Sequence, residues 1–320
     1  MQNLLDDVSC RWTAAMRRGD FESAWRQTDQ IEEARREMQR TVGFKRSDHQ
    51  LIWNGETFHE KHILIRCQHG YGDTIQFIRY CPLVKELAKS VHVEVQPALL
   101  ELLDGMEGID RLIDGWNKTT ERWQGIEIEC MELTYAFRHN VQTLPRAVPY
   151  LPVERLIKRR PLLGVEWPKQ PKIGLVWASS EWDRDRSVLP SDLEPLKFMR
   201  DAAVFSFQQD RPDSDYEAFS FPITAISSLT RNVADAAVGL LSMDLVITVD
   251  CMMAHLAGAL GRPVWVLLKH EPDWRWLDQG TDSPWYPTMR LFRQPRRGDW
   301  KTPVSQIASS LEDFFSKLPQ

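Results

Sequence analysis

The run Asp250-Cys251-Met252-Met253-Ala254-His255 combines residue types that can bind an anion. It follows the β-forming residues 246–249, and helix-forming residues continue to Leu260 before a second apolar run at 264–268. This pattern predicts strand, helix and strand, with polar residues at the carboxyl end of the first strand, where open parallel sheets bind ligands. Free N–H groups at a helix start attract an anion, and His255 one turn later can donate a further hydrogen bond. We therefore predict a diphosphate site at Asp250, Cys251, Met252 and His255.

Two of these side chains also have structural interpretations. A single histidine is often a core residue with hydrogen-bonded ring nitrogens, and this alternative stays open for His255. A nucleophilic Cys251 would need a base, and nothing nearby marks His255 as that base. Cys251 is therefore interpreted as a small buried residue beside the site.

A second candidate is Gly70-Tyr71-Gly72-Asp73-Thr74, directly after the apolar run 62–67. Gly70 and Gly72 permit close backbone approach and positive φ. A dinucleotide-binding fingerprint would need a third glycine at position 75, where the chain has Ile75, so an oxidoreductase is disfavoured. Asp73 falls where the next helix is expected to begin. It is either an N-cap, a common role for aspartate, or a general base facing a cleft.

The third candidate is the loop after residues 172–177. Ser179 and Ser180 are small hydroxyl residues suited to phosphate oxygens, and Arg184 or Arg186 would neutralise a diphosphate. The alternative is a solvated loop in which arginine and aspartate pair with each other. No set of His, Cys, Asp and Glu has metal-ligand spacing, so we expect a site without metal or other cofactor.

Alternating strand and helix patterns position these loops. Strands are expected at 62–67, 91–95, 111–113 and 126–128, with helices at 75–89 and 97–104, and a second series has strands at 172–177, 203–207, 244–249, 264–268 and 289–292 and a helix at 235–242. Such alternation implies parallel sheets covered by helices on both faces. The expected fold is α/β: two doubly wound, Rossmann-like domains facing each other across a cleft.

The predicted domains are an N-terminal one at 48–155 and a C-terminal one at 156–302, flanked by helical segments. Residues 1–47 predict two helices joined at Gly19-Asp20, and Arg18–Trp25 resembles part of a tetratricopeptide hairpin. One hairpin is not a repeat array, so it either packs on the next domain or docks a protein partner through residues 1–45. Residues 303–320 predict a helix whose apolar stripe packs back across both domains.

The composition excludes some classes of partner and indicates the cellular compartment. The net charge of −5 gives no general attraction to nucleic acid. No apolar run reaches the length of a membrane span, and no secretory signal is expected, although peripheral membrane association stays open. Five cysteines without a CxxC pair indicate a reducing compartment. We therefore expect a cytoplasmic protein.

Taken together, these residues resemble glycosyltransferase family 9, the bacterial ADP-heptose:lipopolysaccharide heptosyltransferases. The resemblance is strongest to the branch that follows tetratricopeptide repeats. It covers the chain from about residue 50 to 315, in the stretches 70–80, 172–178, 244–261, 263–268, 272–276 and 283–287. The resemblance implies a GT-B fold and inverting transfer without metal from an ADP-heptose-like nucleotide sugar. The acceptor would be a glycan, lipopolysaccharide or a protein.

The resemblance also implies roles for the residues. Asp73 matches the proposed general base, and the Ser179-Ser180 loop, a following arginine and the run 250–255 match the donor-binding residues. Trp274 and Trp276 are expected either to stack on sugar rings or to pack in the core. Cys251-Met252-Met253 departs from the hydroxyl and small residues usual in the family, so a related binding protein without turnover is the alternative.

Overall fold

The computed structural model describes residues 2–42, 53, 55–115, 123–159, 166–198, 202–209 and 211–317. The chain divides into two compact units. Unit 1 comprises Met1–Leu100, Asp104–Arg146 and Pro272–Gly280, and unit 2 comprises Glu101–Leu103, Ala147–Glu271 and Thr281–Gln320. Residues 272–280, here called the return segment, therefore belong to unit 1 although most of unit 2 precedes them in sequence. The division near residue 147 comes before the predicted boundary at 155/156, which falls inside helix α7 (Val153–Arg159). The predicted boundary at 47/48 lies outside the described residues.

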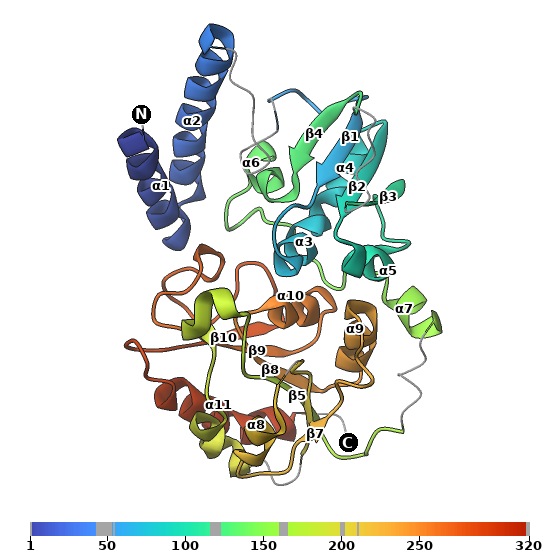
Figure 1. Ribbon diagram of the computed structural model, residues 1–320, viewed down its shortest axis with the longest axis vertical. Coiled ribbons are helices and arrows are strands. Elements are labelled where there is room, and N and C mark those ends of the chain that lie inside the picture. The colour runs from blue at the N-terminus through green and yellow to red at the C-terminus, as the bar shows by residue number, and fades with distance from the viewer. Residues whose placement is uncertain are drawn as a thin grey trace. The chain divides into compact units, whose positions relative to one another are not determined.

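Unit 1 contains a parallel four-stranded sheet (Figure 1). Its strands are β1 (His62–Arg66), β2 (Ser90–Val95), β3 (Arg111–Asp114) and β4 (Ile126–Glu129), in the order β3-β2-β1-β4. The chain proceeds from β1 to β2 and β3 on one side and then places β4 on the other. The carboxyl ends of β1 and β4 thus flank a topological switch point, where open sheets bind ligands.

Short helices follow these strands. They are α3 (Tyr71–Phe77), η1 (Ile78–Tyr80), α4 (Cys81–Leu87), η2 (Pro97–Leu99), α5 (Leu100–Leu103), η3 (Cys130–Glu132) and α6 (Leu133–Ala136). The expected single helix at 75–89 is wrong in its bounds, since three short helices cover residues 71–87. Pro82 explains the break: it has no N–H to continue the preceding turn, but it fits the first turn of a new helix, α4.

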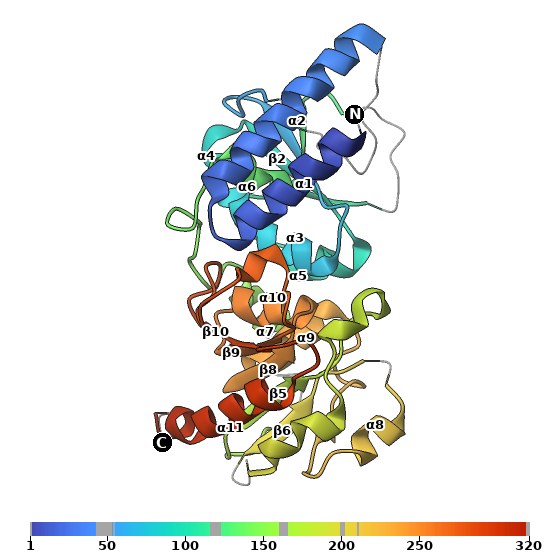
Figure 2. The same cartoon turned by 90° about the vertical axis from the view of Figure 1, so that its left-hand side faces the viewer.

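The N-terminal hairpin consists of α1 (Gln2–Arg17) and α2 (Phe21–Val42), which lie side by side (Figure 2). Gly19 joins them with φ of 77°, a conformation that glycine adopts without steric cost. The hairpin packs on the rest of unit 1. Trp25 Nε1 donates to the carbonyl of His139 at 2.8 Å, and Asp29 accepts from the hydroxyl of Tyr135 at 2.7 Å. Of the two alternatives drawn from the sequence, the structure therefore shows the first, in which the hairpin packs on the domain that follows it.

Unit 2 contains a parallel six-stranded sheet. Its strands are β5 (Lys172–Val176), β6 (Ala203–Ser206), β7 (Thr224–Ala225), β8 (Leu245–Val249), β9 (Val264–Leu268) and β10 (Met289–Arg293), in the order β10-β9-β8-β5-β6-β7. Every residue of β8 and β9 is buried, as expected of continuous apolar runs in a sheet covered on both faces. Strand order reverses between β5 and β8, so their carboxyl ends form the switch point of this unit.

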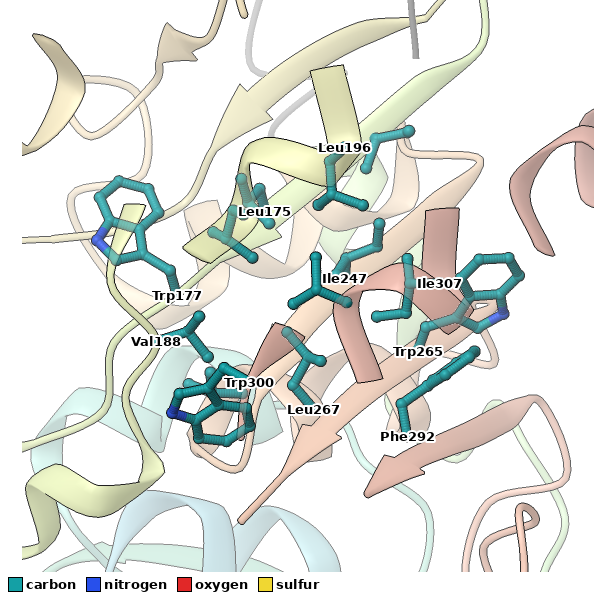
Figure 3. Close-up of a cluster of buried hydrophobic side chains, with 14 of the residues drawn as sticks. Leu175, Trp177, Val188, Leu196, Ile247, Trp265, Leu267, Phe292, Trp300 and Ile307 are labelled. Carbon is teal, nitrogen blue, oxygen red and sulfur yellow. The ribbon is translucent and has the colours of Figure 1, made fainter. Parts of the chain in front are cut away.

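Helical segments flank this second sheet. Besides α7 they are η5 (Glu181–Arg186), η6 (Pro190–Phe198), α8 (Asp213–Glu217), α9 (Val233–Leu241), α10 (Met252–Ala259) and α11 (Lys301–Ser316), and η7 (Trp274–Trp276) lies in the return segment. Figure 3 shows Leu175, Ile247 and Leu267 of three adjacent strands gathered in one cluster with Ile307 of α11 and Leu196 of η6. The final helix was expected to pack across both domains. The structure instead places its buried apolar stripe in the core of unit 2.

None of the helices in the described part of the chain has the length and apolar character needed to cross a membrane.

Candidate functional site

Asp73 lies in the first turn of α3, directly beyond β1. Gly70 is the N-cap residue, and the backbone N–H of Gly70 donates to Asp73 Oδ2 at 2.8 Å. Asp73 thus caps the helix from its third position, so the expectation that Asp73 itself is the N-cap is wrong by three residues. Gly70 has φ of −69°, and a Cβ there would lie 3.0 Å from Asp73 Oδ2. Close approach, not positive φ, is what the glycine provides.

The other oxygen of Asp73 is bound by Arg275 of the return segment. Arg275 Nη2 donates to Asp73 Oδ1, and Arg275 Nη1 donates to Asp273 Oδ1 at 2.8 Å. The guanidinium carbon lies 4.7 Å from the ring centroid of Trp274 and 5.6 Å from that of Phe77. Arg275 is only 8% exposed, so this ion pair is shielded from water on the arginine side.

The ends of β2 and β4 complete the surroundings in unit 1. Gln96, after β2, donates to the carbonyl of His69 at 2.7 Å and accepts from the hydroxyl of Thr74 at 3.0 Å. It therefore ties the loop after β1 to the start of α3. Glu129, at the end of β4, is buried, and burial raises the pKa of its carboxyl, although His69 and the N–H of Met131 act in the opposite direction.

The two candidate tryptophans of the return segment take part in packing. Trp276 is fully buried, so the expectation that its ring offers a face to a sugar is wrong. Trp274 is partly buried and packs edge-on against Trp12 at 5.5 Å and Phe21 at 6.5 Å between ring centroids. These rings fasten the return segment to the N-terminal hairpin.

In unit 2, the loop after β5 is fixed at its start by Gln208. The side-chain oxygen of Gln208 accepts from the backbone N–H groups of Trp177 at 3.2 Å and Ala178 at 2.9 Å. The N–H of Ser179 then donates to Ser187 Oγ at 3.1 Å, and Ser180 Oγ lies 3.5 Å from Arg186 Nη2. The two predicted serines are thus held at the carboxyl end of β5.

The charged residues of this loop pair with one another, as the structural alternative predicted. Asp183 Oδ2 lies 3.6 Å from Arg186 Nε and accepts from Lys269 Nζ at 2.8 Å. Arg184 pairs with Glu181, and its side chain is 81% exposed, whereas that of Arg186 is 12% exposed. Sequence reasoning missed Lys269. The available signal was its position directly after β9, at the same edge of the sheet.

The run 250–255 lies where it was expected, after β8 and into α10. Asp250 is buried, Cys251 is the N-cap residue, and Met252 begins the helix. Burial raises the pKa of the Cys251 thiol, but the residue is only partly buried, so the interpretation as a small buried residue holds in part. His255 is buried too, and its Nδ1 lies 3.0 Å from the hydroxyl of Tyr286. This hydrogen bond is the one expected of a satisfied core histidine.

Each unit therefore collects its own candidates at its own switch point. Unit 1 places Gly70, Gly72 and Asp73 after β1, and unit 2 places Ser179, Ser180 and Arg186 after β5 beside Asp250 and His255 after β8. The Lys269–Asp183 ion pair joins the loop after β9 to the loop after β5. Within the described ranges, no group of three or more His, Cys, Asp and Glu residues could hold a metal ion.

Known proteins that resemble the chain identify its fold. No protein-family model matches the chain. Protein FlbA of Caulobacter vibrioides is 23% identical over an alignment of 300 residues that covers 82% of this chain and 48% of FlbA. The chain thus spans about half the length of this curated relative.

The solved structures are more informative. A glycosyl transferase family 9 protein from Veillonella parvula superposes with a TM-score of 0.57 and 11% identity, covering 82% of this chain and 99% of that one. The chain has the fold of the family 9 glycosyltransferases. E. coli heptosyltransferase WaaC with ADP gives a TM-score of 0.53 and 11% identity, covering 80% of this chain and 99% of WaaC. The predicted α/β architecture of two Rossmann-like halves is therefore confirmed as the family 9, GT-B-like fold, which by itself does not determine function.

Proposed function

We propose that the chain is an inverting, metal-independent glycosyltransferase. It transfers a sugar from an ADP-heptose-like nucleotide sugar to a hydroxyl of a glycan, lipopolysaccharide or protein. The observation that carries this proposal is the placement of polar candidates at both switch points of a family 9 fold. A solved relative, WaaC, was crystallised with ADP, which supports an adenine nucleotide donor.

Unit 2 is proposed to bind the donor. The hydroxyls of Ser179 and Ser180 and the N–H groups at the start of α10 can donate to the diphosphate oxygens. Arg186 and Lys269 supply positive charge near the same sheet edge, where they now share Asp183. Arg184 is exposed and contributes less, since solvent screens its charge. Met252, the first residue of α10, is proposed to contribute its backbone N–H to the same diphosphate, and His255 lies one turn further along that helix.

Unit 1 is proposed to supply the base. Asp73 accepts the proton of the acceptor hydroxyl while that oxygen forms a bond to the anomeric carbon. The bond from the anomeric carbon to the donor phosphate breaks at the same time, and its electron pair leaves on the nucleoside diphosphate. The sugar passes through an oxocarbenium-like state, and a single displacement inverts its configuration. Charge that builds on the diphosphate is stabilised by donors and cations already in place.

A second candidate function is a sugar-nucleotide binding or scaffold protein with little or no turnover. Two observations favour it. Both oxygens of Asp73 already accept hydrogen bonds, from Gly70 and from Arg275. The side chain of Cys251 makes no cap hydrogen bond at the start of α10, where family 9 usually has a hydroxyl residue.

The compartment and partners complete the proposal. All five cysteines are free thiols in the structure, which supports a reducing compartment and hence the cytoplasm. Because residues 18–25 resemble part of a tetratricopeptide hairpin in sequence, we propose that the solvent-facing side of the α1–α2 hairpin serves a protein partner. The match covers only 48% of FlbA, so this relative has further segments outside the matched region.

The first prediction tests the reaction. Purified protein is screened by thermal shift against ADP-, UDP-, GDP- and dTDP-sugars, and release of nucleoside diphosphate is then followed with the donor that binds. Asp73→Asn should lower turnover by about 10²–10⁴-fold, because the proton acceptor is lost. Donor affinity should be kept, since the donor residues lie in unit 2.

Controls separate the alternatives. Asp313→Asn on the exposed end of α11 should leave turnover unchanged, and a chelator should not slow the wild type. Donor binding without turnover, in the presence of candidate acceptors, would favour the scaffold function instead.

A further inference from the structure

The return segment places one arginine against the proposed base. Asp73 Oδ2 accepts from the N–H of Gly70 at 2.8 Å, and Oδ1 accepts from Arg275 Nη2. Each carboxylate oxygen therefore has one fixed donor, and each keeps a lone pair for another partner. A carboxylate held at both oxygens has lost its freedom to rotate.

Arg275 is itself fixed from several sides. Its Nη1 donates to Asp273 Oδ1 at 2.8 Å, and Nη2 lies 3.8 Å from Met131 Sδ. The faces of Trp274 and Phe77 pack against the guanidinium. A planar guanidinium fits such a slot and binds two carboxylates at defined angles, whereas an ammonium group is a flexible point charge. The contact with Asp73 is thus built into unit 1 and is not a chance surface pair.

We propose that Arg275 is a positioning residue for the transfer reaction: it orients the Asp73 carboxylate toward the acceptor hydroxyl. This inference rests on the proposed function, in which Asp73 is the base. General-base transfer depends on angle as well as distance, and a displacement of about 1 Å can lower a rate about 10²-fold. In this proposal Arg275 acts on the reaction only through Asp73, whose Oδ1 it holds.

The alternative is that Arg275 only holds the return segment in place within unit 1. The ion pair between Arg17 and Asp278 provides a matched control for that alternative. Arg17 Nε pairs with Asp278 Oδ1 at 2.6 Å, and the N–H of Asp278 donates to the carbonyl of Arg17 at 2.8 Å. This pair fastens the same segment to α1 and involves neither Asp73 nor Arg275. Removing it weakens the attachment without altering the partners of the carboxylate.

The experiment compares R275M, R275K, R275A and R17M by the release of ADP from ADP-heptose, with unfolding temperature measured for each. R275M should lower kcat by about 10²-fold or more while KM for the donor stays within about threefold. R275K should recover only part of the loss, and added methylguanidinium should raise kcat of Arg275→Ala but not of the wild type. R17M should lower the unfolding temperature yet keep kcat within about threefold.

Each outcome has a meaning. Equal loss of kcat in R17M and R275M, or wild-type kcat in R275M, overturns the positioning role alone. Absence of turnover by the wild type with every donor and acceptor overturns the proposed function and this inference together. Should R275M not fold, R275K and D273N carry the test, because D273N removes one partner of the guanidinium and leaves Arg275 in place.

Discussion

Tyr286 determines how α10 packs in unit 2. Its hydroxyl lies 3.0 Å from His255 Nδ1, and a Cβ added at Gly258 would lie 2.6 Å from Tyr286 Cδ1. Residues 255 and 258 are three apart, so they share one face of the helix. The ring of Tyr286 is fully buried and has no room to move away. The glycine is therefore required by close approach of a ring.

Gly258→Ala tests this packing, and two effects of opposite sign compete. Alanine favours a helix over glycine by about 0.5–1 kcal/mol, whereas overpacking a close-packed core costs about 1–3 kcal/mol. We expect the clash to dominate, because the contact falls well inside normal van der Waals distance. Urea unfolding should show a lower free energy of unfolding for G258A than for the wild type. A more stable variant would contradict the packing described for Tyr286.

Some site residues could be predicted from the sequence, whereas the residues that they pair with could not. Asp73 and His255 could be predicted because each follows a recognisable apolar strand within a few positions. Their partners Arg275 and Tyr286 lie 202 and 31 positions away. Such pairings leave no local pattern, so the ion pair and the hydrogen bond appear only in the folded chain.

Among the elements, the strands were the easiest to predict. Continuous apolar runs identified β8 and β9, because a strand buried on both faces has no polar alternation. The two-residue strand β7 was missed, since so short a segment carries no periodic signal. The helix after β1 was predicted four residues late because Tyr71 and Gly72 are weak helix formers, and capping by Asp73 starts it there.

The turn between α1 and α2 gives a pH-dependent prediction. Asp20 Oδ1 accepts from the backbone N–H of Ser23 at 3.1 Å, and hydrogen bonds from Ser23 lower the pKa of Asp20. A lowered pKa means that this cap stabilises the fold above the ordinary pKa of about 3.9 and that the stabilisation is lost as pH falls through the lower, folded-state value. Asp20→Ala should therefore cost about 1 kcal/mol at pH 7 and less at pH 2–3.

Urea unfolding of wild type and D20A at both pH values measures this change. D20N serves as the control, because its amide oxygen can cap the helix without titrating. The difference between D20N and D20A should stay constant with pH. If the wild-type difference stays constant as well, the cap does not depend on the charge of Asp20.

For the molecule as a whole, alternation of strands and helices correctly indicated two parallel-sheet halves. The sequence did not predict that the return segment belongs to unit 1. Its residues follow β9, and the predicted C-terminal domain at 156–302 included them, yet they belong to unit 1. The driving force is burial of aromatic surface on Trp12 and Phe21 of the N-terminal hairpin and on Phe77 of α3.

Trp274→Ala should release this attachment. Loss of a half-buried indole is expected to destabilise unit 1 by about 2–4 kcal/mol. Hydrogen exchange in the intact protein should then speed up at the amide of Asp278, which donates to the carbonyl of Arg17. Exchange at Val266 in the centre of β9 should be unchanged, because that strand belongs to unit 2. Equal acceleration at both amides would show that the segment does not belong to unit 1 alone.

The return segment also has a consequence for biosynthesis. The ribosome makes residues 1–146 before the return segment. The nascent chain therefore cannot bury the ring of Phe77 against Trp274 until the return segment, which ends at residue 280, has left the exit tunnel. Nearly all strands of the second sheet are translated during that interval. Unit 1, although its synthesis begins first, therefore stays incomplete until most of unit 2 has been translated, and only Thr281–Gln320 of unit 2 remains to be made after it.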